Sequence, residues 1–149
     1  MKVIFLDFDG VLNSRNFVRD NFSGGVIIDP SRLELIKFIV DKTNAKIVLT
    51  TSWREHWEKE GGNIICEEIN NFFADFDLEI FDKTPDLEDR ESEIEAWLVQ
   101  CDEDIESFVV LDDMFLSSDL LKDHFVLTSN LRNGIDEDDA LKAIEILNR

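Results

Sequence analysis

The chain has 149 residues, of which 44% are hydrophobic, and this size and composition fit one globular domain, residues 1–149, and exclude a disordered chain. Its 34 acidic residues outnumber its 15 basic ones. The resulting net charge of −19 excludes an extended nucleic-acid footprint, because neutralising many phosphates needs lysine and arginine. No apolar run approaches the roughly 20 residues that span a bilayer, and the N-terminus is not a signal peptide, so we expect a soluble cytoplasmic protein with no membrane partner.

Hydrophobic patterns predict strands and helices that alternate along the chain. The apolar run at residues 3–6 predicts a strand buried on both faces, and the polar stretch 13–29 predicts a loop or small excursion. Asp29 and Pro30 are typical of a helix N-cap and first turn, and this helix extends to Val40. Residues 46–49 predict the second strand, and a helical pattern then runs to Phe76.

The second half of the chain continues this alternation. Residues 78–81 predict a weaker third strand, and Thr84-Pro85 separates it from a helix that reaches Cys101. Strands are predicted at 108–111 and 125–127, with a turn or short helix at 117–121 between them. Asp136 is expected to cap a final helix with an apolar face. That face comprises Leu141, Ile144 and Leu147. Cys66 and Cys101 form no CxxC motif, and we expect both to be free and buried.

This order of elements predicts an α/β fold. Strands that alternate with helices imply right-handed crossovers and a mostly parallel sheet that is covered on both faces. We therefore expect a single Rossmann-like, three-layer αβα sandwich with five strands.

Polar side chains follow three of the predicted strands, at the edge where open parallel sheets bind ligands. These residues are Asp7, Asp9, Thr50, Thr51, Ser52, Asp112 and Asp113. Crowded carboxylates repel one another, and a divalent cation relieves that repulsion. Ligation by oxygen atoms alone suits Mg²⁺, which would also attract an anionic substrate to this acidic protein.

Asp7 and Asp9 lie two residues apart at the end of the first strand, and on an extended chain both would point to the same side. Gly10 allows a tight turn directly after them. One carboxylate can then act as a nucleophile while its neighbour exchanges a proton with the leaving group and water. The alternative is that Asp-x-Asp-Gly only begins a loop, since acids before glycine are common in turns.

Three segments resemble motifs of the haloacid-dehalogenase-like (HAD) hydrolase superfamily, in the order in which that superfamily carries them. Residues 5–12, FLDFDGVL, are similar to its first motif; residues 47–50, IVLT, to its second; and residues 109–113, VVLDD, to its fourth. The resemblance implies that Asp7 is the nucleophile and Asp9 the general acid and base, and that Thr50 orients the phosphate. It also implies a Mg²⁺ site formed by Asp7, Asp9, Asp112 and Asp113, with Asp9 contributing its backbone carbonyl.

The third motif of the superfamily is a lysine or arginine before the fourth strand. By position this residue is Arg90, with Lys83 as the competitor, and an ordinary surface salt bridge is the alternative role for Arg90. Residues 51–54, TSWR, together with residues 83–85, KTP, are similar to the small HAD domains of RNA-repair proteins. By this similarity Trp53 and Arg54 would lie beside the pocket, where either could contact the substrate, and Thr51 is a further substrate-binding candidate. Core packing of Trp53 and a salt bridge of Arg54 are the alternatives.

The resemblance implies a magnesium-dependent phosphatase that works through an aspartyl-phosphate. The short stretch 13–29 and the single helix between the third and fourth strands leave no place for a large cap domain, so we expect an open site that admits bulky substrates. Candidate substrates are a nucleic-acid end, a nucleotide or a phosphoprotein, with a small phosphate ester still possible on the same chemistry. Which of Thr50, Thr51 and Ser52 contacts the phosphate stays open, as does the oligomeric state.

Two other functions use similar folds. A receiver domain of bacterial signalling also has an acidic magnesium pocket, but it carries its phosphorylated Asp after the third strand and a Lys after the fifth. Here the third strand ends in Phe81-Asp82 and the fifth in Thr128-Ser129. A non-catalytic interaction module that retained the fold is the second alternative, and the presence of Asp7, Asp9 and Asp112 argues against it.

Overall fold

One parallel sheet organises the protein, whose structure is a computed structural model that describes residues 1–149. Its strand order is β3-β2-β1-β4-β5, and every neighbouring pair is parallel. The strands are β1 (Lys2–Leu6), β2 (Lys46–Leu49), β3 (Ile80–Lys83), β4 (Ser107–Asp112) and β5 (Phe125–Leu127). The prediction of a five-stranded α/β fold is confirmed.

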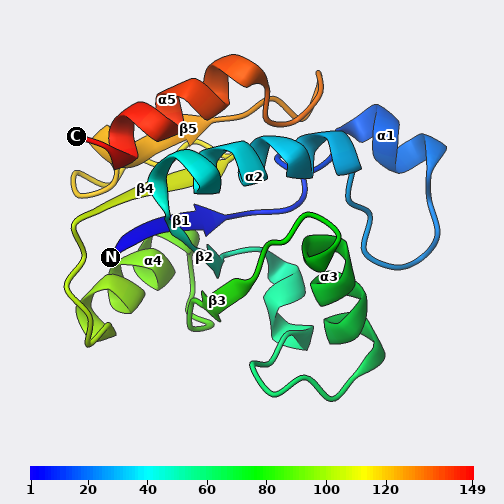
Figure 1. Ribbon diagram of the computed structural model, residues 1–149, viewed down its shortest axis with the longest axis horizontal. Coiled ribbons are helices and arrows are strands. Elements are labelled where there is room, and N and C mark those ends of the chain that lie inside the picture. Colours follow the sequence, from blue (N-terminus) through cyan, green and yellow to red (C-terminus); the bar gives the residue numbers. More distant parts are fainter.

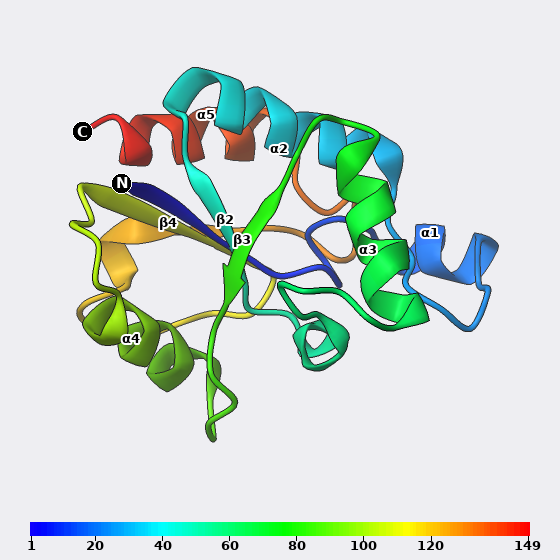
Figure 2. The same cartoon turned by 60° about the horizontal axis from the view of Figure 1, so that its bottom comes forward.

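Helices cover both faces of this sheet. They are α1 (Arg15–Asp20), α2 (Pro30–Thr43), α3 (Ile64–Ala74), α4 (Arg90–Gln100) and α5 (Glu137–Leu147), with short 3₁₀ helices η1 (Ser52–His56) and η2 (Lys122–His124). Helices α2 and α5 lie side by side on one face, and α4 lies on the other (Figures 1 and 2). This arrangement is the three-layer αβα sandwich that the alternation of elements predicts, and it contains no inserted cap domain.

The strand β1 shows how the two layers of core form. Ile4 and Leu6 belong to the larger apolar cluster, which includes side chains of α2, α3 and α5. Val3 and Phe5 point to the opposite face and belong to the smaller cluster, which α4 completes. All four side chains are fully buried, and burying each contributes roughly 1.5–3 kcal/mol. The continuous apolar run therefore marks the centre of the sheet.

Capping residues set the start of the long helices where the sequence indicates them. The Asp29 carboxylate accepts a hydrogen bond from the backbone N–H of Ser31 at 2.9 Å, and Pro30 occupies the first turn of α2. Asp136 and Asp139 form a reciprocal capping box at the start of α5. These local contacts satisfy backbone N–H groups that have no partner inside the helix.

Several local predictions differ from the structure. The polar stretch 13–29 contains the six-residue helix α1, and β3 begins at Ile80 rather than Leu78. Cys66 is buried, whereas Cys101 is only half-buried because it lies at the end of α4; both are free. Leu141 is 56% exposed on α5, where alanines at 140 and 143 face the sheet instead.

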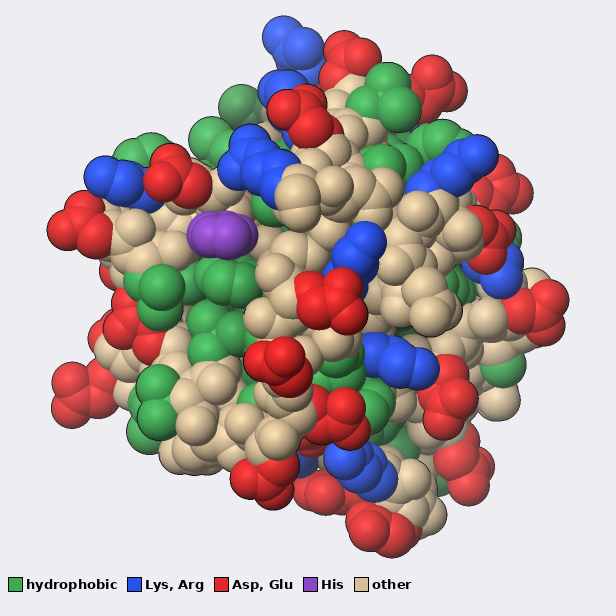
Figure 3. Space-filling model, turned by 60° about the vertical axis from the view of Figure 1, so that its left-hand side comes forward, with side chains coloured by type: hydrophobic (Ala, Val, Ile, Leu, Met, Phe, Trp, Pro, Cys, Tyr) green, Lys and Arg blue, Asp and Glu red, His purple; other side chains and the backbone are tan.

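The surface agrees with the acidic composition. Figure 3 shows Asp and Glu side chains spread over one face of the molecule, with Lys and Arg between them and apolar side chains in small groups. Acids distributed in this way are solvated, and they keep the protein charged without forming a single binding surface on this face. None of the helices combines the length and apolarity that crossing a membrane requires.

Candidate active site at the carboxyl edge of the sheet

The sheet itself positions the candidate residues. Its hydrogen-bond ladder continues one residue past the strand ends. The N–H of Asp7 donates to the carbonyl of Leu111 at 3.2 Å, and the N–H of Thr50 donates to the carbonyl of Leu6 at 3.0 Å. Asp112 is the last residue of β4, the neighbour of β1. Asp7, Thr50 and Asp112 are therefore held side by side by the three central strands, β2, β1 and β4.

Three carboxylates converge at this edge. Asp7, Asp112 and Asp113 each place one oxygen within 4.8 Å of the others. Asp112 is fully buried, Asp7 is 6% exposed, and Asp113 is half-buried. Burial, together with the Asp112 and Asp113 charges, raises the pKa of Asp7 to about 7 against the opposing effect of Arg90. Burial and the Asp112 charge also raise the pKa of Asp113.

Arg90 is the basic residue that faces this cluster. Its Nη1 lies 2.6 Å from Oδ2 of Asp112 and 3.2 Å from Oδ2 of Asp7. It is the first residue of α4, whose N-cap Asp89 accepts a hydrogen bond from the Ser92 N–H. The helix start therefore fixes the base of the Arg90 side chain and aims its guanidinium at the two aspartates. A surface salt bridge does not describe this geometry.

The net negative charge of the acidic cluster favours the binding of a divalent cation. Three carboxylates face one guanidinium, which amounts to −3 + 1 = −2 when all are ionised. The donor atoms are all oxygens, the ligand type that Mg²⁺ takes, and few protein ligands suit an ion that keeps several waters. The donor set thus fits the predicted Mg²⁺. Asp7, Asp112 and Asp113 could contribute their side chains, and the Asp9 carboxylate lies outside the cluster.

A glycine is required at position 10 both by the backbone conformation and by the close approach of the Asp113 side chain. Its φ of +85° lies in the left-handed region, which glycine adopts without strain. A Cβ at this position would overlap the Asp113 carboxylate. The absence of a side chain therefore allows the loop after β1 to turn and the acid after β4 to approach it.

Asp9 is exposed, in contrast to Asp7. Its Oδ1 accepts a hydrogen bond from Nδ2 of Asn13 at 3.0 Å. An exposed carboxyl at the mouth of a buried acidic cluster can reach both solvent and a bound substrate. This location suits a group that exchanges protons, whereas the buried Asp7 suits a nucleophile.

Of the hydroxyls after β2, Thr50 has the geometry of an anion ligand. Its Oγ1 is buried and has no hydrogen-bond partner, although buried polar atoms are nearly always paired. Thr51 instead caps η1, because its Oγ1 accepts a hydrogen bond from the Trp53 N–H, and Ser52 is exposed. The geometry favours Thr50 over the other two.

Arg54, another substrate-binding candidate, makes its polar contacts within the protein. Its guanidinium is buried and donates to the carbonyls of Thr50, Thr51, Thr84 and Pro85 and, at 2.6 Å, to Glu93 on α4. These contacts use all five N–H donors of the guanidinium. Arg54 therefore ties the ends of β2 and β3 to α4, and its neighbour Trp53 packs against the larger core.

Lys83 is also committed elsewhere. Its Nζ donates to the carbonyls of Arg54 and Trp57 and to the carboxylate of Glu58, at 2.7–3.1 Å. Three acceptors satisfy all three protons of an ammonium group. Arg90, rather than Lys83, therefore faces the acidic cluster.

Sequence reasoning did not single out several residues that build the site. Asn13 binds Asp9, Thr128 Oγ1 donates to the Gly10 carbonyl at 2.7 Å, and Glu93 holds Arg54. Thr128 follows β5, so the rule that ligands lie at strand ends could have identified it. Asn13 and Glu93 carry no such signal, because their partners are set by the folded chain.

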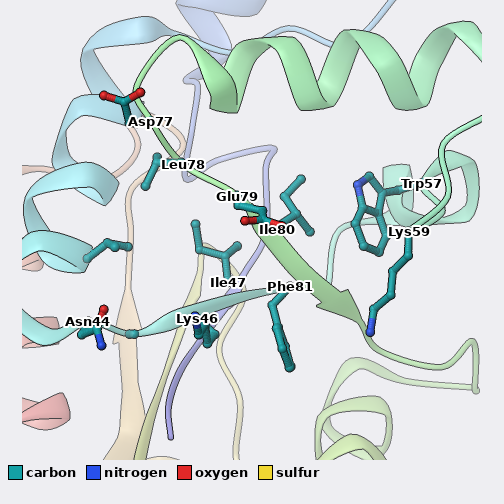
Figure 4. Close-up of a pocket in the computed structure, with 12 residues that line it drawn as sticks. Asn44, Lys46, Ile47, Trp57, Lys59, Asp77, Leu78, Glu79, Ile80 and Phe81 are labelled. Atoms are coloured by element: carbon teal, nitrogen blue, oxygen red, sulfur yellow. The ribbon is translucent and has the colours of Figure 1, made fainter.

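A cavity of about 470 Å³ is separate from the acidic cluster. It is lined by residues of β2 and of the edge strand β3 (Figure 4). Trp57, Ile80 and Phe81 line it, and Lys59 lies 5.2 Å from the Phe81 ring centroid. No group of three acids or other metal-binding side chains converges there. The chemistry of the protein therefore concentrates at the carboxyl edge of the sheet.

Comparisons with known proteins agree with this geometry. Searches of curated proteins and of solved structures gave no match. A scan against protein-family models matches residues 3–140, nearly the whole chain, to the family described as the HAD domain in Swiss Army Knife RNA repair proteins. Because that match covers far more than half of the chain and includes every residue of the acidic cluster, the chain belongs to this family of HAD domains.

Proposed function

We propose that this protein is a magnesium-dependent phosphatase that cleaves phosphomonoesters through an aspartyl-phosphate on Asp7. Membership of a HAD family supports hydrolase chemistry in general. The observation that carries the specific proposal is the group of Asp7, Asp112 and Asp113, which faces a single arginine at the strand ends where the Thr50 hydroxyl is buried without a partner. Such a site has an excess of negative charge, one cation and one free donor for a phosphoryl oxygen.

In the first step a carboxylate oxygen of Asp7 attacks phosphorus, and the bond between phosphorus and the ester oxygen breaks. Asp9 gives its proton to the departing oxygen, so an alcohol leaves and Asp7 carries the phosphoryl group. In the second step Asp9 removes a proton from water, which attacks the same phosphorus. The bond to Asp7 then breaks, and phosphate leaves with both aspartates restored.

Arg90 and Thr50 would position the phosphoryl group. Arg90 can contribute a fixed positive charge, and the Thr50 hydroxyl can donate to a phosphoryl oxygen. Mg²⁺, held by the side chains of Asp7, Asp112 and Asp113 with the Asp9 backbone carbonyl, would supply the remaining neutralisation of charge.

The substrate is proposed from access to the site. No cap domain covers the carboxyl edge, so a phosphate on a bulky molecule can reach Asp7. The family description refers to RNA repair proteins, and this favours a terminal phosphate of a nucleic acid, with nucleotides and phosphoproteins as further candidates. The charge of −19 limits such binding to the chain end, because few basic residues are available for a longer footprint.

The strand order argues against the receiver alternative. Receiver domains have the order 2-1-3-4-5, whereas this sheet has the order β3-β2-β1-β4-β5. In addition, Asp82 in β3 accepts a hydrogen bond from the Trp97 indole at 2.8 Å and is therefore engaged in packing.

A release assay tests the proposal. Phosphate release is measured with and without Mg²⁺ from a small phosphate ester, a 3′-phosphorylated oligonucleotide and a phosphopeptide, with excess EDTA as the control. We expect turnover that depends on the metal and is faster for one of the bulky substrates. Absence of Mg²⁺-dependent release from all three would contradict the proposed function.

A further inference from the structure

The side chain of Asn13 is almost completely enclosed at the mouth of the site. It is 1% exposed, although it lies in the loop between β1 and α1. Its Oδ1 accepts a hydrogen bond from the Gly10 N–H at 3.0 Å. Its Nδ2 donates to Oδ1 of Asp9 at 3.0 Å and to the carbonyl of Ile27 at 2.8 Å. One buried amide thus joins the turn after β1, the exposed carboxyl of Asp9 and the segment before α2.

The surrounding backbone determines which way this amide points. The Gly10 N–H can only donate, so it must face the amide oxygen, and the Ile27 carbonyl can only accept, so it must face the amide nitrogen. An amide turned by 180° would place two donors together at Gly10 and two acceptors together at Ile27. The N–H group of Asn13 therefore faces Asp9 by necessity.

The main chain around Asn13 is also fixed. The Arg15 N–H donates to the carbonyl of Asn130 at 3.0 Å, which ties the loop to the segment after β5. Gly134 packs so closely on this loop that a Cβ there would lie 2.7 Å from the Asn13 carbonyl oxygen. The amide is thus held by the protein, and it cannot follow a moving Asp9.

Asp9 has no other restraint of this kind. The bond from Asn13 is the one hydrogen bond that its exposed carboxyl makes within the chain, and Asp9 forms no ion pair. Because Oδ1 already faces an N–H donor, a proton on the carboxyl must reside on Oδ2.

We propose that Asn13 is a positioning residue, which holds Asp9 by Oδ1 and presents Oδ2 to the leaving group. This role rests on the proposed function, in which Asp9 is the general acid. It assigns to Asn13 the orientation of the proton that the departing ester oxygen receives. It also explains why an asparagine is buried under a loop that could otherwise be closed by an apolar side chain.

The leaving group provides a test that a purely structural role would not pass. An alkyl phosphate has a basic leaving oxygen that needs protonation, whereas p-nitrophenyl phosphate releases a weakly basic one. For Asn13→Ala we expect kcat/KM on the alkyl ester, which reports the step in which the leaving group departs, to fall about 10- to 100-fold, a part of the full effect of general acid catalysis. We expect kcat/KM on p-nitrophenyl phosphate to fall less than about threefold, and kcat is not used because the second step is common to both esters.

Two further variants control for folding and for the direction of the hydrogen bond. Asn13→Asp keeps the size of the side chain and the acceptor for Gly10 but replaces the donor that faces Asp9, so we expect the same dependence on the leaving group. Asn70→Ala removes a comparable network, in which Asn70 bonds Trp57 and Cys66 and no acid of the site, and should lower kcat/KM on both esters equally or not at all. An equal fall on both esters in Asn13→Ala would overturn the proposed role.

A measurement without substrate separates this inference from the proposed function. Side-chain NMR couplings of Asp9 should indicate one χ1 rotamer in the wild type and averaging over several rotamers in Asn13→Ala. Averaging already in the wild type would overturn the role of Asn13, whatever the activity. If the wild type hydrolyses neither ester while Asp9 is held in one rotamer, the proposed function fails and the hydrogen bond stands without a catalytic purpose.

Discussion

Two arginines at the carboxyl edge of the sheet, the buried Arg54 and the half-buried Arg90, have opposite surroundings. Arg54 uses all of its N–H donors on four backbone carbonyls and one buried carboxylate, Glu93. Arg90 faces two carboxylates directly, with a third beside them. The first arginine is saturated and its charge is balanced, whereas the second lies in an excess of negative charge. Arginines that look alike in a sequence therefore differ in whether they can act on a ligand.

The excess charge also has a structural cost. Burial favours the neutral form of Asp7, and the carboxylates around it oppose its ionisation. A protein that keeps such a cluster gives up stability at a site where it can gain binding, either of a cation or of a phosphoryl group held by Arg90. The contrast between the two arginines leads to five predictions. In each, one pKa unit or a tenfold change in a rate or equilibrium constant corresponds to about 1.4 kcal/mol.

The largest effect on activity is expected for Asp7→Asn, in the acidic cluster that Arg90 faces. Removing the nucleophile should lower kcat by about 10⁴-fold or more, because the reaction loses the atom that attacks phosphorus. The fold should persist, since the amide has the size of the carboxyl and removes a buried charge. Phosphate release and thermal unfolding measure the two effects. Turnover that survives in this variant would contradict the assignment of Asp7.

For Arg54→Met we expect a loss of about 3–5 kcal/mol in the free energy of unfolding, because Glu93 is left buried without its partner. Urea unfolding measures this loss. The double variant with Glu93→Met should recover part of it, since no lone charge remains. If Arg54→Met instead kept its stability and lost affinity for phosphate, Arg54 would be a ligand-binding residue and the contrast would break.

The matching change at the other arginine, Arg90→Ala, should act mainly on catalysis. We expect kcat/KM to fall about 10²- to 10³-fold, because the phosphoryl group loses its fixed positive charge. Arg90→Lys should restore part of the activity, since lysine provides a point charge without the planar fork. Inhibition by vanadate should weaken in parallel. If Arg90→Ala lost as much free energy of unfolding as Arg54→Met, Arg90 would stabilise the fold in the way that Arg54 does.

The raised pKa of Asp7 predicts how stability depends on pH without metal. In the unfolded chain Asp7 titrates near 3.8, and in the folded protein its pKa is about 7, so the folded state binds the extra proton between these values. The stability that the raised pKa of Asp7 contributes is fully present below about pH 4 and is lost as pH rises to about 7. The loss in the free energy of unfolding is a few kcal/mol at most. Urea unfolding in EDTA, compared with Asp7→Asn, measures this loss.

Added Mg²⁺ should reverse that loss at neutral pH, because a cation that binds only the folded state stabilises it. If the free energy of unfolding of the wild type did not change from pH 4 to 7, or if it fell equally in Asp7→Asn, the pH dependence would not come from Asp7.

The smallest effect is expected for Thr50→Val. Loss of one hydrogen bond to the phosphoryl group should lower kcat/KM about tenfold. Stability should stay unchanged or rise slightly, because the variant removes a buried hydroxyl that has no partner in the protein. Kinetics and thermal unfolding on the same sample test both parts. Thr51→Val, which removes the cap of η1, is the matched control and should lower stability instead.

Much of the site could be predicted because it follows from local rules. The apolar run that ends in Asp7 identifies a central strand, and parallel strands place their carboxyl ends at one edge of the sheet. Arg90 was favoured over Lys83 only by position along the chain. The folded protein separates the two, since three acceptors satisfy Lys83 while Arg90 reaches the aspartates.

The sequence by itself determined the αβα architecture, the strand ends and the acids that follow them, because periodicity, capping and chain direction act over short distances. Only the tertiary structure decided what Asn13, Arg54 and Thr50 do. Their partners lie up to 39 residues away along the chain, as for Arg54 and Glu93, or, for the Thr50 hydroxyl, are absent from the protein. Hydrogen bonds of this kind depend on how distant segments pack, and no local pattern encodes them.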